Sequence, residues 1–326
     1  MKRAVVTGAG GFIGSHLVRF LKQKGYYVRG IDINRPEFSK TAADEFIVAD
    51  LRNQRAANKA IVKADELYML AANVGGVGFI HSVHAQIAHD NVLINTNTLE
   101  VAKIQRIPRI FFSSTACIYP IELQQDVANG GLKEKDAYPA HPDSMYGWEK
   151  LFTENLCLSY GIDHNMNVRI ARFHNIYGPE STFQGGREKS PAALCRKVAL
   201  AKDNGVIEIW GDGKQTRSYC YIDDCCKGIY RLIQSSCNQP LNIGSDRLVS
   251  INDLADMISH IANKKLRKHH NTSMPQGVRG RNSDNSLAKN VLGWEASVSL
   301  EDGLTKTYQW IRRQLQNQRR KDKNPA

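Results

Sequence analysis

The first half of the chain alternates short apolar runs with longer amphipathic segments. Apolar runs of strand length occupy residues 2–7, 27–31, 45–49, 66–72, the stretch from 110, and 167–172. Helical periodicity fills the intervals at about 11–21, 54–64, 82–104 and 146–158. Strands that alternate with helices pair in parallel, so the pattern predicts an α/β fold with a doubly wound parallel sheet.

After residue 173 the alternation becomes less regular. The pattern predicts a helix within 184–202, strands at 207–210, 217–222 and 241–243, and helices at 228–234, 249–262 and 300–316. We therefore expect the first domain to span residues 1–173. Residues 174–326 would form mainly a smaller C-terminal domain, and the chain would return to the sheet at about 216–242.

Three glycines, Gly8, Gly11 and Gly14, follow the first predicted strand and open the first helix. Gly8 and Gly11 allow a tight turn and a close approach of the backbone to a pyrophosphate, and Gly14 lets the helix pack on the strand. Asp32, about 20 residues on, is placed to bind the adenosine ribose hydroxyls. This combination predicts a Rossmann domain for a dinucleotide. Asp32 favours NAD over NADP, because a carboxylate repels a 2′-phosphate.

Polar side chains gather where the fifth predicted strand ends: Ser113, Ser114, Thr115 and Cys117. Open α/β sheets bind ligands at this end of their strands. Tyr146 and Lys150 follow on the next helix, and their i, i+4 spacing puts them on one face. A second glycine-rich loop, 73–78, also follows a strand. We predict that these segments line one ligand site.

Composition limits the class of protein. The 326 residues are 42% apolar and 23% charged, which is typical of a globular protein. No apolar run reaches membrane-spanning length and the N-terminus has no apolar signal core, so we expect a cytoplasmic protein without membrane association. The seven cysteines contain no CxxC pair, which argues against disulfides and a metal site.

The net charge of +12 is concentrated in part in the tail, 312–323, which we expect to be solvated and frayed. A basic balance suits an anionic substrate. No basic stretch is interleaved with aromatic residues, so we expect no nucleic-acid partner.

The motifs TGAGGFIG, SSTACIY, RFHNIYGP and LGW, with Tyr146 and Lys150, resemble the extended short-chain dehydrogenases/reductases that modify nucleotide sugars, the NAD-dependent epimerase/dehydratase family. Members of that family are typically homodimers, here expected to join through helices 82–104 and 145–158. The resemblance implies an NAD site made of Gly8, Gly11, Phe12, Ile13, Gly14, Asp32, Asp50, Tyr146 and Lys150.

Longer strings, among them ACIYP, GGREKSPAALCRK, WGDGKQTRSYCYIDD and GVRGRNSDN, resemble the GDP-mannose 3,5-epimerase family more closely. The implied reaction converts GDP-D-mannose to GDP-L-galactose, with GDP-L-gulose as a further candidate product. It proceeds by transient NAD-dependent oxidation at C4, inversion at C3 and C5, and re-reduction. The chain departs from the family pattern at Thr115, where serine is expected, and at Asn73, where an acid is expected.

The resemblance also implies the catalytic roles. Tyr146 would be the base for the C4 hydroxyl, with Lys150 stabilising its phenolate and Thr115, or Ser114 as the alternative, polarising the C4 oxygen. Cys117 would be the base and Lys189 the acid at C3 and C5. The expected substrate contacts are Gly75, Thr115, Cys117, Asn175, Lys189, Lys197, Gln215, Arg217 and Arg281, with Arg279 as the competing choice for Arg281.

Two other interpretations stay open. The chain could be another nucleotide-sugar 4-epimerase or a 4,6-dehydratase, although a dehydratase needs an acid next to the threonine, where this chain has Ala116 and Cys117. It could also be a non-catalytic NAD-sensing protein on the same fold. Such a protein would have no need to keep all the catalytic side chains together.

Overall fold

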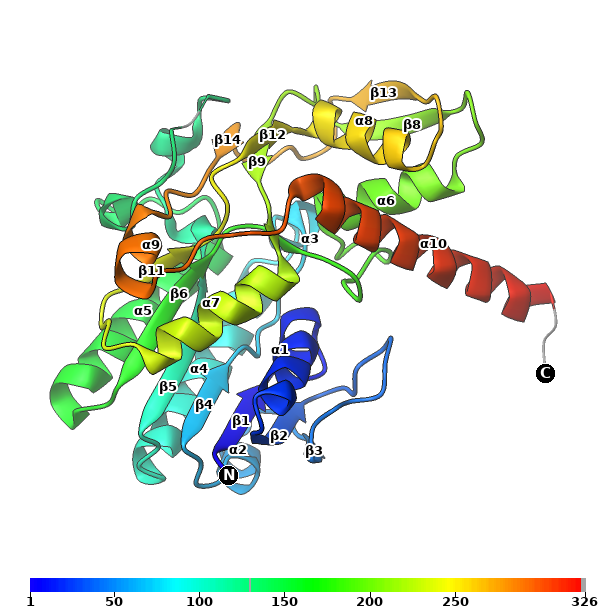
Figure 1. Cartoon of the computed structure of the whole chain (residues 1–326). Helices are drawn as coiled ribbons and strands as arrows, with labels where there is room; N and C mark the ends of the chain where they lie inside the picture. The colour runs from blue at the N-terminus through cyan, green and yellow to red at the C-terminus, as the bar shows by residue number, and fades with distance from the viewer. Residues whose placement is uncertain (129, 324–326) are drawn as a thin grey trace.

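The computed structural model describes residues 1–128 and 130–323, and a seven-stranded parallel sheet forms its centre (Figure 1). The strand order is β11 (Leu241–Ile243), β6 (Val168–Phe173), β5 (Arg109–Thr115), β4 (Glu66–Met69), β1 (Arg3–Thr7), β2 (Tyr27–Asp32) and β3 (Glu45–Val48). Every neighbouring pair is parallel. The predicted α/β fold with a doubly wound parallel sheet is confirmed.

Helices cover both faces of the sheet. One face packs against α1 (Phe12–Gln23) and α7 (Ile222–Gln234), and the other against α2 (Gln54–Ala60), α4 (Ala85–Ile104) and α5 (Met145–His164). Successive strand residues point to opposite faces. Tyr68 and Phe111 accordingly belong to the first core, and Leu67 and Phe112 to the second.

A second region, made from C-terminal segments, lies beside the carboxyl ends of the strands (Figure 1). Its helices α6 (Ser190–Leu200), α8 (Ile251–Ile261) and α10 (Leu300–Lys323) pack on one another. Two small sheets accompany them. One pairs β8 (Val206–Trp210) with β13 (Arg267–Asn271), and the other joins β12 (Leu248–Ser250), β9 (Thr216–Ser218) and β14 (Gly280–Arg281). The pair β7 (Ile176–Tyr177) and β10 (Cys220–Tyr221) connects this region to the main sheet.

Three features differ from the sequence-based expectation. The expected strand 217–222 is divided into β9 and β10, and α7 begins at Ile222, where Asp223 and Asp224 favour a helix N-terminus. The helix α10 continues to Lys323, so the prediction of a frayed tail from 312 is wrong. Several short elements were not predicted: α3 (Val77–Ile80), α9 (Ser286–Leu292), β7, β12, β13, β14 and the 3₁₀ helices η1 (Ala116–Ile118), η2 (Ile121–Gln124) and η3 (Glu134–Ala137).

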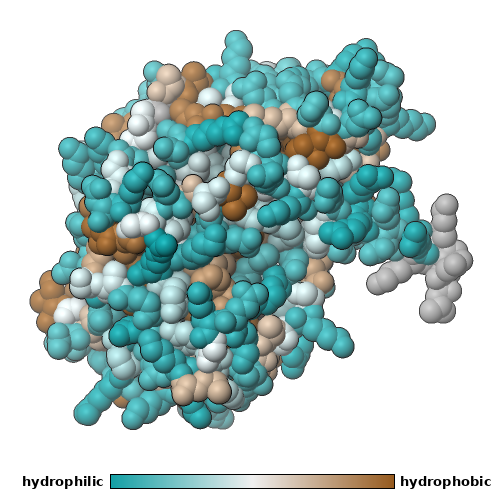
Figure 2. All heavy atoms as spheres, viewed as in Figure 1, coloured by the Kyte–Doolittle hydropathy of each residue, from teal (hydrophilic) through white to brown (hydrophobic). Residues whose placement is uncertain are grey.

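The visible face of the molecule is largely hydrophilic, with separate hydrophobic patches (Figure 2). Over residues 1–128 and 130–323, no helix has both the length and the apolarity that crossing a bilayer requires.

Candidate active site

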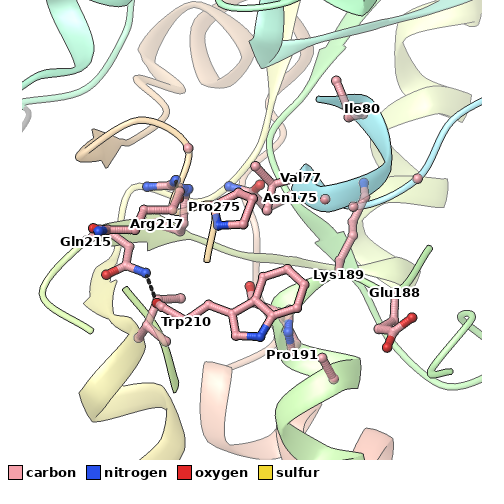
Figure 3. Close-up of a pocket in the computed structure, with 18 of the residues that line it drawn as sticks. Val77, Ile80, Asn175, Glu188, Lys189, Pro191, Trp210, Gln215, Arg217 and Pro275 are labelled. Atoms are coloured by element: carbon pink, nitrogen blue, oxygen red, sulfur yellow. Dashed lines mark hydrogen bonds between the residues drawn. The ribbon is translucent and has the colours of Figure 1, made fainter. Parts of the chain in front are cut away.

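A cavity of about 380 Å³ opens between the carboxyl ends of the strands and the C-terminal region. Figure 3 shows the Trp210 ring lying across it, with Arg217 and Gln215 at one end and Lys189 at the other. The cavity brings Tyr146 together with all nine side chains or backbones expected to contact substrate: Gly75, Thr115, Cys117, Asn175, Lys189, Lys197, Gln215, Arg217 and Arg281.

The polar cluster at the end of β5 divides between the interior and the cavity. Ser113 donates to the Met69 carbonyl at 2.9 Å, and Ser114 donates to the buried Glu154 carboxylate. Thr115 and Cys117 line the cavity, and the Thr115 hydroxyl oxygen accepts the Cys117 backbone N–H at 3.3 Å. Both serine hydroxyls are thus bonded to interior groups, which leaves Thr115 as the hydroxyl available to a ligand.

Close backbone contact brings helix α5 to the same place. A Cβ at Gly147 would lie 2.2 Å from the Cys117 carbonyl oxygen, so only glycine lets the first turn of α5 approach η1 this closely. Ser144 caps that turn by accepting the Gly147 N–H. As a result Tyr146 lies beside the strand end and lines the same cavity as Thr115.

Tyr146 and Lys150 differ in their surroundings. Burial raises the pKa of Tyr146, the charges of Cys117 and Glu149 raise it further, and the Thr115 hydrogen bond opposes them. The buried Lys150 donates to the Ser113 carbonyl at 3.0 Å, and its Nζ lies 5.9 Å from the centroid of the Tyr146 ring. Burial lowers the pKa of Lys150. The backbone contact thus fixes the Lys150 Nζ on the same side of α5 as the Tyr146 ring.

A guanidinium is held directly against the Cys117 thiol. Arg281 Nη1 lies 3.1 Å from Cys117 Sγ, Nη2 lies 3.1 Å from Asp143 Oδ2, and Nε donates to Gln124 Oε1. Burial lowers the pKa of Arg281, but the charges of Cys117 and Asp143 outweigh burial and raise it above its usual value. Sequence reasoning missed Asp143 and Gln124, because both lie in the irregular stretch after residue 120 and carry no motif.

Lys189 precedes α6 as its N-cap residue and projects into the cavity (Figure 3). The Lys189 side chain is exposed to the cavity. Desolvation by the surrounding protein lowers its pKa, and the charge of Cys117 opposes this shift. The thiol and this ammonium thus belong to one cavity although 71 positions of sequence separate them.

The remaining cations differ in how far they are neutralised. Lys197 Nζ lies 3.1 Å from the Glu208 carboxylate, whereas Arg217 donates to the carbonyls of Thr216 (2.7 Å) and Gln276 (3.3 Å). Among the ion pairs of the described residues, none involves Arg217. An anionic ligand in the cavity would therefore meet an unneutralised guanidinium at this position.

Three further side chains complete the comparison with the sequence prediction. Asn175 donates to the Ser218 carbonyl at 2.9 Å. Gln215 donates to the Trp210 carbonyl at 2.9 Å, and its buried Oε1 has no hydrogen-bond partner within the described chain. Arg279, the alternative to Arg281, does not line the cavity and pairs through both Nη atoms with Asp212.

His174 is not part of the cavity lining. It is fully buried, its Nε2 lies 3.0 Å from Asn242 Oδ1, and burial lowers its pKa to about 3. A neutral, buried imidazole of this kind serves the packing between β6 and β11.

The residues expected to hold a dinucleotide fit one at the start of α1. Gly8 begins the turn after β1 with a φ of +72°, Gly11 is the N-cap of α1, and neither a side-chain cap nor an acidic residue occupies the first turn of the helix. The N–H groups of Phe12, Ile13 and Gly14 therefore lack intrahelical partners and can receive a pyrophosphate.

The two acids of the predicted NAD site lie at the end of β2 and after β3. The Asp32 carboxylate accepts the N–H groups of Gly10 (2.9 Å) and Asn34 (3.1 Å), which fixes it at the end of β2. Asp50 is paired with Arg52 at 2.8 Å. The cradle therefore has the free N–H groups and the fixed carboxylate at β2 that NAD requires.

Comparison with known proteins gives the family. The model of the NAD dependent epimerase/dehydratase family matches residues 4–244. The chain belongs to this family. GDP-mannose 3,5-epimerase of Arabidopsis thaliana is 48% identical over 97% of this chain and 84% of its own length, and GDP-mannose 3,5-epimerase 1 of Oryza sativa subsp. indica is 47% identical over 97% and 83%.

Solved structures of other family members have the same fold. UDP-glucose 4-epimerase of Thermotoga maritima, solved with UDP-glucose, superimposes with a TM-score of 0.87 at 26% identity, covering 96% of this chain and 99% of that one. UDP-glucuronic acid 4-epimerase of Bacillus cereus, solved with UDP-glucuronic acid and NAD, gives 0.81 at 29% identity over 96% and 99%. The similarity extends over both the sheet and the C-terminal region.

Proposed function

We propose that this family member is a GDP-mannose 3,5-epimerase that converts GDP-D-mannose to GDP-L-galactose, with GDP-L-gulose as a second product. The observation that carries the proposal is the presence of Cys117 and Lys189 in one cavity with Tyr146 and Thr115. Inversion of a carbon needs a proton acceptor and a proton donor on opposite faces of the ring. A thiol and an ammonium provide such a pair. The names of the two plant relatives support the same substrate.

The first chemical requirement is an acidic C–H bond at C3 and C5. A ketone at C4 acidifies both neighbours, and bound NAD would supply the acceptor and later the donor of the C4 hydride. Tyr146 takes the C4 hydroxyl proton, and Thr115, which lines the same cavity, polarises the C4 oxygen. Because burial raises the pKa of Tyr146, the fixed ammonium of Lys150 is needed to favour the phenolate.

The second requirement is proton transfer at the two neighbouring carbons. Cys117 removes the proton, and the contact with Arg281 stabilises the sulfur as an anion. Lys189 delivers a proton from the other side, and its lowered pKa makes it a better acid than an ordinary lysine. Each inversion exchanges one carbon-bound hydrogen for one from solvent.

The third requirement is a partner for the diphosphate. Arg217 is the best candidate, since it has no carboxylate partner, and Lys197, Asn175, Gln215 and the backbone at Gly75 complete the contacts. The two regions of the fold would therefore bind different ligands. The sheet region, 1–173 with the return of the chain at about 216–242, would hold NAD through Gly8, Gly11, Phe12, Ile13, Gly14, Asp32 and Asp50. The C-terminal region would hold the GDP-sugar.

Incubation with GDP-mannose in deuterated water tests the proposal. We expect deuterium at both C3 and C5 of the product, and a Cys117→Ser variant should lose this exchange while still oxidising C4. No incorporation from GDP-mannose, together with turnover of UDP-sugars, would identify a 4-epimerase instead. Full epimerase activity in Cys117→Ser would show that the assigned base is wrong.

We infer further that the chain forms a homodimer through α4 and α5. Three exposed apolar side chains of α5, Met145, Trp148 and Phe152, lie at i, i+3 and i+7 and so share a face. Sedimentation analysis of Phe152→Glu tests this, because a charge in the interface should give a monomer. Free thiols at all seven cysteines support a reducing, cytoplasmic location.

A further inference from the structure

The segment that carries Lys189 lies against the glycine-rich loop after β4. Gly76 N–H donates to the Arg187 carbonyl at 3.0 Å. A Cβ at Gly76 would lie 2.3 Å from the Glu188 carbonyl oxygen. The two backbones therefore approach to a distance that only glycine permits, and they border the cavity from the same side.

The Arg187 side chain reaches from the segment that carries Lys189 to the glycine-rich loop after β4. Its guanidinium carbon lies 3.9 Å from the centroid of the Phe79 ring, within the range of a cation–π interaction. Its Nη1 donates to Asn73 Oδ1 at 3.2 Å and reaches the Val74 carbonyl at 3.5 Å. One side chain thus contacts both ends of the glycine-rich loop, although it is exposed and does not line the cavity.

Asn73 connects this contact to helix α4. Its Nδ2 donates to Asp90 Oδ2 at 3.1 Å, and its backbone N–H donates to Asn91 Oδ1 at 2.6 Å. Asn91 in turn donates to the Asn73 carbonyl at 3.2 Å. A carboxylate at position 73 would face the Asp90 carboxylate, whereas the amide donates to Asp90 and accepts from Arg187. This explains why an amide suits this chain at the position where the family pattern has an acid.

The segment that carries Lys189 needs a restraint from outside, because two glycines precede it. Gly185 and Gly186 have φ values of +89° and +85°, and a Cβ at either would meet nothing within 4 Å. On the other side Glu188 is fixed, because it accepts the Gly186 N–H at 2.7 Å and pairs with Arg196 at 3.2 Å. Lys189 follows directly, without an ion-pair partner among the described residues. Its position therefore depends on how the preceding residues are held.

We propose that Asn73, Phe79 and Arg187 form a clasp that positions the Lys189 ammonium for proton delivery, with Arg187 as the positioning residue. The inference rests on the proposed function. Proton transfer requires heavy atoms within about 3.2 Å, and a displacement of about 1 Å can cost a factor of about 100 in rate. The clasp supplies that precision from outside the cavity, by tying the lysine-bearing segment to α4.

The test separates proton delivery from C4 oxidation. In Arg187→Ala we expect deuterium incorporation and product formation to fall about 10- to 100-fold in kcat. Reduction of bound NAD on addition of GDP-mannose, followed at 340 nm, should stay within about 3-fold of wild type, because Tyr146 and Lys150 lie on α5. Arg3→Ala is the matched control, since its guanidinium also covers a ring, that of Tyr27 at 5.3 Å, far from the cavity on β1.

Phe79→Leu provides a second variant, which keeps the arginine but removes the ring. It should reduce incorporation as well, and Arg187→Ala combined with Phe79→Leu should be no worse than Arg187→Ala alone, because both remove one contact. Amide hydrogen exchange of residues 185–190 should rise in Phe79→Leu whatever the enzyme's substrate.

Three results would overturn the clasp. They are wild-type deuterium incorporation in Arg187→Ala, equal loss of NAD reduction and incorporation, and unchanged amide exchange in Phe79→Leu. Absence of incorporation in the wild-type enzyme would instead refute the proposed function. The amide-exchange comparison would then still decide whether the clasp holds the segment.

Discussion

Removal of the Arg217 side chain should weaken binding of the GDP moiety. The guanidinium borders the cavity and is satisfied by the Thr216 and Gln276 carbonyls, at 2.7 and 3.3 Å. Burial, and then the nearby charge of Arg281, lower the pKa of Arg217 to about 10. The surroundings therefore disfavour the charged guanidinium in the free protein, and the negative charge of a bound diphosphate would stabilise it.

The hydrogen bonds between guanidinium and phosphate set the magnitude of the effect. Hydrogen bonds to charged groups contribute about 1.5–3 kcal/mol each, so two of the weaker kind are worth about 3 kcal/mol. Since about 1.4 kcal/mol is tenfold in affinity, Arg217→Ala should raise the Kd for GDP about 100-fold.

Isothermal titration with GDP measures this directly, without turnover. Arg217→Lys should recover part of the affinity, because it keeps the charge but loses the two-pronged geometry. Arg279→Ala is the matched control, since Arg279 lies outside the cavity lining and is paired with Asp212 at 2.9 and 3.1 Å. The reasoning fails if the Kd for GDP changes less than about 3-fold in Arg217→Ala, or if Arg279→Ala weakens binding equally.

Three further predictions concern the reaction and the fold. Tyr146→Phe removes the acceptor of the C4 hydroxyl proton and should lower kcat at least about 100-fold with GDP affinity unchanged, and a nearly wild-type rate would contradict that role. Desolvation by the surrounding protein lowers the pKa of Lys189, and an acid works only while protonated, so kcat should fall as the pH rises through a value below the usual lysine range. In Lys189→Arg that alkaline limb should disappear from the pH profile, and its persistence would assign it to another group. Glu154 and Arg172 form a buried pair at 2.7 Å, so Glu154→Ala should lower the free energy of unfolding in urea by about 3–5 kcal/mol, and a loss below about 1 kcal/mol would count against this.

The elements that the sequence predicted well are those with a long, local signal. The buried strands β1, β2, β4 and β5 and the helices α1 and α4 were all expected within a few residues of their bounds, and α5 was expected from its first turn but continues six residues past the expected end at 158. A continuous apolar run or a helical period depends only on nearby positions. The two-residue strands β7 and β14 have no such signal, because they exist only through pairing with distant segments.

Local pattern also predicted the dinucleotide cradle, since a glycine turn between a strand and a helix, with an acid at the end of the next strand, is specified within about 30 residues. The resemblance to a known family then named the side chains that line the cavity, including Cys117 and Lys189. In both cases the necessary information lies in residue types and short spacings.

Only the tertiary structure decided what each polar group faces. It placed Arg281, rather than Arg279, against the Cys117 sulfur, and it added Asp143 and Gln124 as the groups that hold the guanidinium there. It also showed that Asn73, which departs from the family pattern, donates a hydrogen bond to Asp90 and accepts one from Arg187. These contacts join residues that are distant in sequence. Their distances and desolvation arise only when the chain has folded, so no local pattern could determine them.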